Sequence, residues 1–102
     1  MAAAESAFEW DPFKAETNEE KHGVSFVEAA NALLGLTLTR IAGHTAENRF
    51  ASIGITEARP IVVIWTPRPG AVRVISARRA RRNERETYRQ AIGRAAEVSA
   101  SD

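Results

Sequence analysis

The sequence predicts one α+β domain over residues 1–102, in which a short strand and two helices precede an antiparallel β-meander and a final helix. Three observations support this fold class. The chain has 102 residues, enough for one domain and too few for two. Helical periodicity occurs near both ends, whereas the middle alternates as strands do. The connections between the expected strands are short, which favours antiparallel neighbours.

The first elements are predicted by their end signals. Residues 8–10 are expected to form a short opening strand. Asp11, which a proline follows, is typical of a helix start, because its side chain can accept hydrogen bonds from first-turn amides. A polar helix is therefore expected over Phe13–Lys21, ended by Gly23 as a left-handed C-cap. Its only clear apolar anchor is Phe13, so we expect it at the periphery of the core.

The second helix has the clearest signals in the first half of the chain. Ser25 with Glu28 three positions later forms a capping box, and Gly35 ends the helix. The apolar residues recur at helical spacing, which predicts one face turned to the core. They are Phe26, Ala29, Ala30, Leu33 and Leu34.

Apolar runs in the middle of the chain predict three or four strands. The expected strands are Leu36–Ile41, Arg49–Ile55, Ile61–Trp65 and Val72–Ala77. The third is apolar throughout, as in a central strand that is covered on both faces. In the second, alternation places Ala51, Ile53 and Ile55 on one face and Phe50 on the other.

A final helix is expected from about residue 81 to residue 97. Its apolar stripe consists of Tyr88, Ala91, Ile92, Ala95 and Ala96. A separate stripe at roughly helical spacing carries Arg78, Arg82, Arg85 and Arg89. The folded core should thus extend over about residues 8–97, with residues 1–7 and 98–102 frayed.

Composition excludes several classes of protein. Hydrophobic residues make up 44% of the chain and charged residues 26%, which excludes collagen-like, coiled-coil and disordered classes. No apolar run approaches the roughly 18 residues that a membrane span needs, and the first residues lack the features of a secretory signal. The chain has no cysteine, which excludes disulfides and thiolate metal sites and favours a cytoplasmic location.

The charges are divided unequally along the chain. Residues 1–57 hold nine acidic and four basic residues, a balance of −5, whereas residues 58–102 hold four acidic and ten basic residues, a balance of +6. All ten of these bases are arginines, which bind phosphate in a bidentate fashion and stack on flat rings. The C-terminal half is therefore expected to meet an anionic partner.

The sharpest local feature is the run Arg78-Arg79-Ala80-Arg81-Arg82, directly after an expected strand. At a strand-to-helix junction, helix N-terminal amides would add to the anion affinity of the guanidinium groups. Two interpretations stay open at this point. The run could hold the phosphates of a nucleic acid, or it could be a basic surface for an acidic protein partner.

Few other residues offer chemistry. The compact signatures of nucleotide, metalloprotease and hydrolase sites are missing, and we expect no metal and no cofactor. His22 is expected to cap helix carbonyls. His44 lies in a turn with Glu47, where it is either inert or able to relay protons near neutral pH. Trp65 is expected in the core, whereas Tyr88 could equally pack or stack on a base.

Two sequence blocks carry a family resemblance. The first is Phe8-Glu9-Trp10-Asp11-Pro12 with Lys14 and Asn18, then Lys21-His22-Gly23-Val24-Ser25-Phe26 with Glu28-Ala29. The second is Arg49-Phe50 with Ile53-Gly54, then Arg73-Val74-Ile75-Ser76-Ala77-Arg78-Arg79-Ala80, then Glu84-Arg85 and Tyr88. Together they span about residues 8–90 and resemble the BrnT toxins of bacterial type II toxin–antitoxin systems.

The resemblance implies a RelE-like fold and an endoribonuclease that cuts RNA and inhibits translation. It also implies a BrnA-like antitoxin, a DNA-binding protein that neutralises the toxin, so that the chain would reach operator DNA only through the toxin–antitoxin complex. These expectations come from the resemblance and not from composition.

A metal-independent mechanism gives the candidate residues their roles. The ribose 2′-hydroxyl attacks its own phosphate, so the site must accept a proton and stabilise negative charge on phosphorus. We expect Arg78 and Arg79 to hold the phosphate, with Arg49 nearby and either Glu47 or His44 as proton acceptor. The further residues expected to contact RNA are Lys21, His22, Arg73, Arg82, Arg85 and Tyr88.

Two other functions stay open. A non-enzymatic nucleic-acid-binding module would use the same arginines without a proton acceptor, and would shift RNA in a salt-dependent way without cutting it. A protein-interaction module would dock an acidic partner on the arginine surface.

Overall fold

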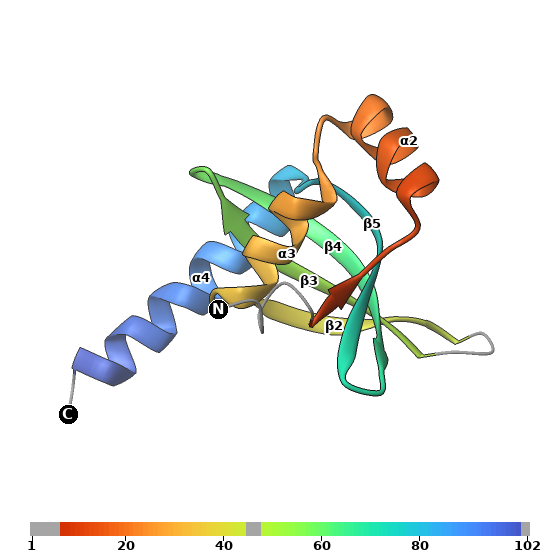
Figure 1. Cartoon of the computed structure of the whole chain (residues 1–102). Coiled ribbons are helices and arrows are strands. Elements are labelled where there is room, and N and C mark those ends of the chain that lie inside the picture. Colours follow the sequence, from red (N-terminus) through yellow and green to blue (C-terminus); the bar gives the residue numbers. More distant parts are fainter. Residues whose placement is uncertain (1–6, 45–47, 101–102) are drawn as a thin grey trace.

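The computed structural model describes residues 7–44 and 48–100, and for residues 44 and 95–100 it describes the backbone (Figure 1). The elements in chain order are β1 (Phe8–Glu9), α2 (Pro12–His22), α3 (Phe26–Leu34), β2 (Leu38–His44), β3 (Asn48–Thr56), β4 (Arg59–Arg68), β5 (Ala71–Arg79) and α4 (Arg82–Ala100). This order confirms the predicted α+β class. No helix in the described part of the chain is both long enough and apolar enough to cross a membrane.

The strands form one mixed sheet in the order β1-β5-β4-β3-β2. The four strands β2 to β5 are a continuous antiparallel meander, and β1 adds to β5 in parallel through Phe8 opposite Val72. The apolar strand β4 lies in the middle, as predicted. Its residues Ile61, Val62 and Val63 are at most 1% exposed, because both faces of this strand are covered.

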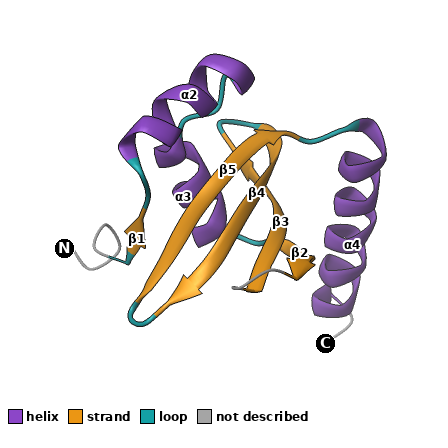
Figure 2. Ribbon diagram, turned by 90° about the vertical axis from the view of Figure 1, so that its right-hand side faces the viewer, coloured by secondary structure: helices purple, strands orange, loops and turns teal. Residues whose placement is uncertain are grey.

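Helices lie on both faces of the sheet (Figure 2). On one face, α2 and α3 cover the larger core, which contains Val24, Phe26, Ala29, Ala32, Ile61, Val63, Val74 and Ala77. The opposite face, here called the α4-side face, carries a smaller cluster of Ala51, Val62 and Ala80, and α4 packs there against β3. Adjacent residues of β4 thus point into different cores, as strand geometry requires.

The helix-end signals have the structure that the sequence predicts. The Asp11 carboxylate accepts hydrogen bonds from the amides of Phe13 and Lys14, and Gly23 ends α2 with φ of 68° in the left-handed region. Ser25 and Glu28 form both hydrogen bonds of the capping box. Each of these signals acts over a few residues, which is why the sequence alone reveals it.

Several expectations about packing were wrong. Phe13 is 82% exposed and is no core anchor, and Leu34 is 60% exposed although it lies on the predicted apolar stripe. The strand expected at Leu36–Ile41 is instead β2, Leu38–His44. Arg78 lies on β5, so it does not belong to the predicted helical arginine stripe.

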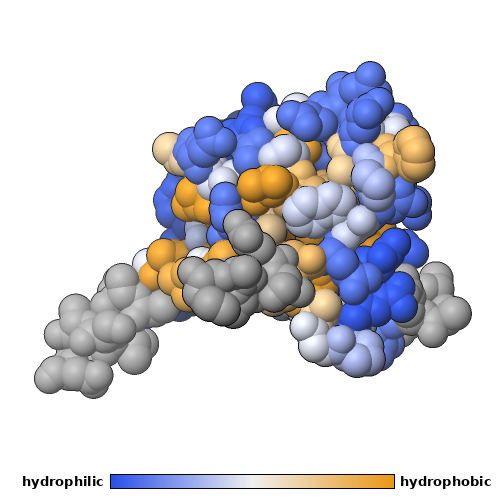
Figure 3. Space-filling model, in the orientation of Figure 1, coloured by the Kyte–Doolittle hydropathy of each residue, from blue (hydrophilic) through white to orange (hydrophobic). Residues whose placement is uncertain are grey.

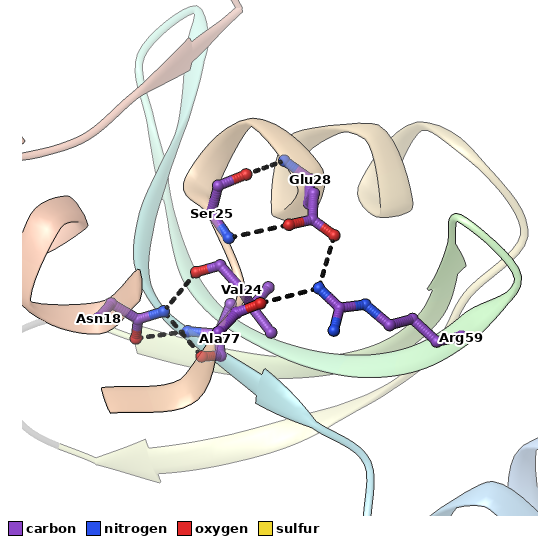
Figure 4. A network of polar contacts seen from close by, with 7 residues as sticks. Asn18, Val24, Ser25, Glu28, Arg59 and Ala77 are labelled. Atoms are coloured by element: carbon purple, nitrogen blue, oxygen red, sulfur yellow. Dashed lines mark hydrogen bonds and ion pairs between the residues drawn. The ribbon is translucent and has the colours of Figure 1, made fainter. Parts of the chain in front are cut away.

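The anchor that holds α2 on the sheet is polar. Asn18 is 7% exposed. Its amide nitrogen donates to the carbonyl oxygens of Val24 (3.0 Å) and Ala77 (2.8 Å), and its oxygen accepts from the Ala77 amide (3.1 Å) (Figure 4). One side chain therefore pairs both backbone groups of a β5 residue beyond the end of β1. In the same region, Arg59 donates to Gly23 and to Glu28 (both 2.8 Å), which ties β4 to the α2–α3 connection.

Gly54 sets how closely α3 approaches β3. A Cβ atom at this position would lie 3.0 Å from the Ala32 carbonyl oxygen and 3.3 Å from the Ala32 Cβ. We expect Gly54→Ala to lower the free energy of unfolding by about 1–3 kcal/mol through overpacking, measured by urea denaturation. Gly43→Ala is the matched control, because a Cβ there meets nothing within 4 Å. Equal stabilities of the two variants would contradict this account.

Candidate functional site

Arginines from three strands project from the α4-side face. They are Arg40 of β2, Arg49 of β3, and Arg73 and Arg78 of β5. The register explains this arrangement: Arg40 pairs with Ala51, and Arg78 pairs with Val62, both of which point into the smaller core. Arg49 is two positions before Ala51 and shares its face. Arg73 pairs with Thr66, which is likewise in phase with Val62 along β4.

A groove of about 570 Å³ opens between this face and the first turns of α4. Its floor is apolar and consists of Leu38, Ala51, Ile53 and Val62. Its polar residues are Thr39, Arg40, Arg81, Asn83, Glu84 and Thr87. An apolar floor with a cationic and amide-bearing rim can accommodate a flat, anionic ligand, because it combines stacking surface with hydrogen-bond donors.

Arg78 and Glu84 form a bidentate ion pair at the end of this groove. The Arg78 Nη1 and Nη2 atoms donate to the two Glu84 carboxylate oxygens at 2.8 Å each, and the Arg81 amide donates to Oε1 at 2.7 Å. The hydrogen bonds from Arg78 hold the pKa of Glu84 at about 2, and the same pair raises the pKa of Arg78. Glu84 is therefore a fixed carboxylate that orients Arg78, and at neutral pH it is too weak a base to accept a proton.

The arginine run is divided between two faces. Arg78 points to the α4-side face, whereas Arg79, the next residue of β5, points to the opposite one and is exposed. Ala80 is buried, and Arg81 and Arg82 lie exposed where α4 begins. Among the side chains that the structure describes, those of residues 7–43 and 48–94, no carboxylate forms an ion pair with Arg79, Arg81 or Arg82.

The comparison with protein families decides the identity. The model of the ribonuclease toxin BrnT of type II toxin–antitoxin systems matches residues 10–84. The chain belongs to this family. The matched segment contains every arginine of the sheet face and the Arg78–Glu84 pair. Membership of this ribonuclease toxin family implies an RNA substrate and a cognate protein antitoxin as partner. A search of curated proteins found no match.

The structure of this BrnT-family chain does not bring all the expected catalytic residues together. Arg49 and Arg73 lie at one end of the α4-side face, whereas Arg78 lies about four strand positions away, or roughly 13 Å. Arg73 donates to Glu9 of β1 at 2.9 Å. The backbone of His44 pairs with Asn48 beside Arg49, but its side chain, and all of Glu47, lie outside the described residues.

The expected RNA-contacting residues are also dispersed. Tyr88 is 8% exposed, its hydroxyl donates to the Leu36 carbonyl at 2.9 Å, and burial raises its pKa. It thus anchors α4 and presents no open ring face. Arg85 donates to the Ala80 carbonyl at 2.9 Å, and Lys21 and His22 lie on α2, away from the groove beside α4.

Sequence reasoning missed one member of the sheet face. Arg40 is exposed and lines the groove, but it lies in a strand whose alternation is weak and whose bounds were misplaced. The signal that could have found it is the register with β3, where Arg40 pairs with Ala51. No group of three or more His, Asp or Glu side chains in the described part of the BrnT-family chain could hold a metal ion.

Proposed function

We propose that this chain is a metal-independent endoribonuclease that cuts RNA in the cytoplasm, inhibits translation, and is neutralised by a BrnA-like antitoxin. The RNA backbone lies along the α4-side face. The observation that carries the proposal is that Arg40, Arg49, Arg73 and Arg78 all lie on that face, and that Arg40 and Arg81 line the groove beside it. Fixed cations at the developing negative charge are typically the largest contribution to phosphoryl chemistry of this kind.

The residues divide between holding the phosphate and moving the proton. Guanidinium groups stay charged at every working pH, so their role is electrostatic. Glu84 is held as a carboxylate with a pKa of about 2 and is no proton acceptor. That role is proposed for His44 or Glu47, which precede Arg49 closely in the chain. Arg78 contributes its charge from a fixed position, because Glu84 prevents it from swinging toward the substrate.

Removing the two exposed cations of the groove should impair RNA cleavage without unfolding the protein. We expect Arg40→Ala/Arg81→Ala to lower kcat/KM on a labelled RNA in EDTA by at least about a hundredfold, since each of the two charged hydrogen bonds contributes roughly 1.5–3 kcal/mol where it is formed. Arg94→Ala, an exposed cation at the far end of α4, is the matched control and should keep wild-type activity. Thermal melting should show that the wild type and both variants are equally folded.

The same experiment separates the proposal from its alternative. RNA that is retarded in a salt-dependent manner but stays intact, both in EDTA and in a parallel reaction with ribosomes and Mg²⁺, would contradict the enzymatic function and support a binding module. Equal cleavage by the wild type and the double variant would place the phosphate site away from the groove.

A further inference from the structure

Helix α2 carries a cationic and aromatic stripe that borders an open groove. Phe13, Lys14, Thr17, Lys21 and His22 line an open groove of about 350 Å³ together with Ile75 and Ser76 of β5. Phe13 is 82% exposed although it is the largest apolar residue of the helix. The only two lysines of the chain are both in this groove. In Figure 3, the surface of α2 at the upper right is largely hydrophilic with a hydrophobic group beside it.

The stripe is held rigidly. Asn18, which also borders the groove, binds both backbone groups of Ala77, so α2 keeps a fixed position over the side of β5. The groove side of α2 is basic, whereas its three glutamates, Glu16, Glu19 and Glu20, do not line the groove. An exposed aromatic ring beside two cations on one helix is typical of a binding surface, and at 82% exposure Phe13 does not belong to the core.

The groove borders the α4-side face at β5. Ser76 lines the groove, and two positions further along β5 is Arg78, which shares its side of the strand. The two surfaces adjoin at an irregularity of β5. There Ile75 is an extra residue between the pairs Ile64–Ser76 and Trp65–Val74. A chain that follows the arginines can therefore continue around β5 to α2.

We propose that this groove binds the single-stranded RNA that flanks the cleaved position, with a base stacked on Phe13 and phosphates held by Lys14 and Lys21. The inference rests on the proposed function for the RNA itself. Lys14 and Lys21 are seven residues apart, or about 10 Å along the helix, so they contact different phosphates. RNA fits better than an acidic peptide, because its bases supply flat faces for Phe13 as well as anions for the lysines.

The test compares a long and a short RNA. Fluorescein-labelled, unstructured 20-nucleotide and 5-nucleotide RNAs are titrated with the wild-type protein, Phe13→Ala, Lys14→Ala/Lys21→Ala and the control Arg94→Ala. We expect Phe13→Ala to weaken binding of the 20-mer by about tenfold, as loss of one stacked base does, and Phe13→Trp to restore it.

The double lysine variant should reduce the slope of log Kd against log salt by about 1.4, or 0.7 per contact. Cleavage should show this as a higher KM for the 20-mer, with kcat and the 5-mer unchanged.

Each outcome decides one statement. If the wild type binds and cuts both RNAs and the α2 variants match it on the 20-mer, this inference is wrong and the proposed function stands. If the wild type neither binds nor cuts RNA, the proposed function itself fails. Loss of affinity for an acidic peptide, together with unchanged RNA affinity, would overturn the inference in favour of a protein partner.

Discussion

Replacing Asn18 with alanine is expected to lower the free energy of unfolding by about 3 kcal/mol. The change removes three hydrogen bonds and leaves the amide of Ala77 and the carbonyls of Ala77 and Val24 without their partner. Each buried polar group left unsatisfied costs about 1–3 kcal/mol. Water from the adjacent groove relieves part of this cost, and the better helix propensity of alanine returns roughly 0.5 kcal/mol. Urea denaturation measures the difference as a lower midpoint at unchanged slope.

The isosteric variant separates the hydrogen bonds from the shape of the side chain. Asn18→Asp keeps the acceptor for the Ala77 amide but sets a carboxylate against two carbonyl oxygens. It should therefore be less stable than Asn18→Ala at pH 7 and should recover as the carboxyl becomes protonated in acid. Thr17→Ala, an exposed change in the same turn, should stay within about 0.5 kcal/mol of wild type. An Asn18→Ala protein as stable as Thr17→Ala would refute the anchoring role.

Breaking the Arg78–Glu84 pair is expected to lower the free energy of unfolding by about 2–3 kcal/mol at neutral pH. The effect should disappear in acid. Arg78 lowers the pKa of Glu84 from its usual 4.5 to about 2 in the folded protein, so between these values the unfolded chain binds more protons than the folded one. The stabilisation is complete above about pH 4.5 and is lost as the pH falls toward 2. The two side chains are 27% and 14% exposed, which keeps the effect somewhat below the roughly 3.4 kcal/mol that 2.5 pKa units represent.

Two variants test the pH dependence. Glu84→Gln and Arg78→Ala should both be less stable than wild type at pH 7, and the Glu84→Gln and wild-type proteins should converge near pH 2. Arg89→Ala removes a pair with Glu86 that is mostly exposed, at 71% and 57%, and should change stability by less than about 0.5 kcal/mol. A stability difference between wild type and Glu84→Gln that is constant from pH 7 to pH 2 would show that the pair does not act through the charge of Glu84.

The sequence predicted the features that depend on neighbouring residues. Asp11, Gly23 and the Ser25–Glu28 box act within one turn, and the apolar run of β4 marks a strand covered on both faces. The roles of Phe13 and Asn18 could not be predicted in this way. They depend on which side of α2 meets β5, and Asn18 makes its contact 59 positions away in the chain.

The site was predictable in its chemistry and less so in its geometry. The excess of arginine in the C-terminal half indicated Arg73 and Arg78 of the sheet face, whereas Arg40 and Arg49 come from the acidic first half. Their division between two faces depends on the alternation of β5, which sends Arg78 and Arg79 apart. The pairing of Arg78 with Glu84 depends on how β5 turns into α4. Arg40 joins the face only because β2 pairs with β3 in one particular register.

The contact between Asn18 and β5 has a consequence for how this chain can meet other chains. A sheet has two edge strands, and a second polypeptide can add a strand to either edge that is not covered. On the β5 side, β1 pairs with the beginning of the strand and Asn18 occupies the amide and carbonyl of Ala77, with α2 packed alongside. Strand β2 lies at the other side of the sheet and pairs with β3. A second chain that adds a strand to this sheet would therefore pair with β2 and not with β5.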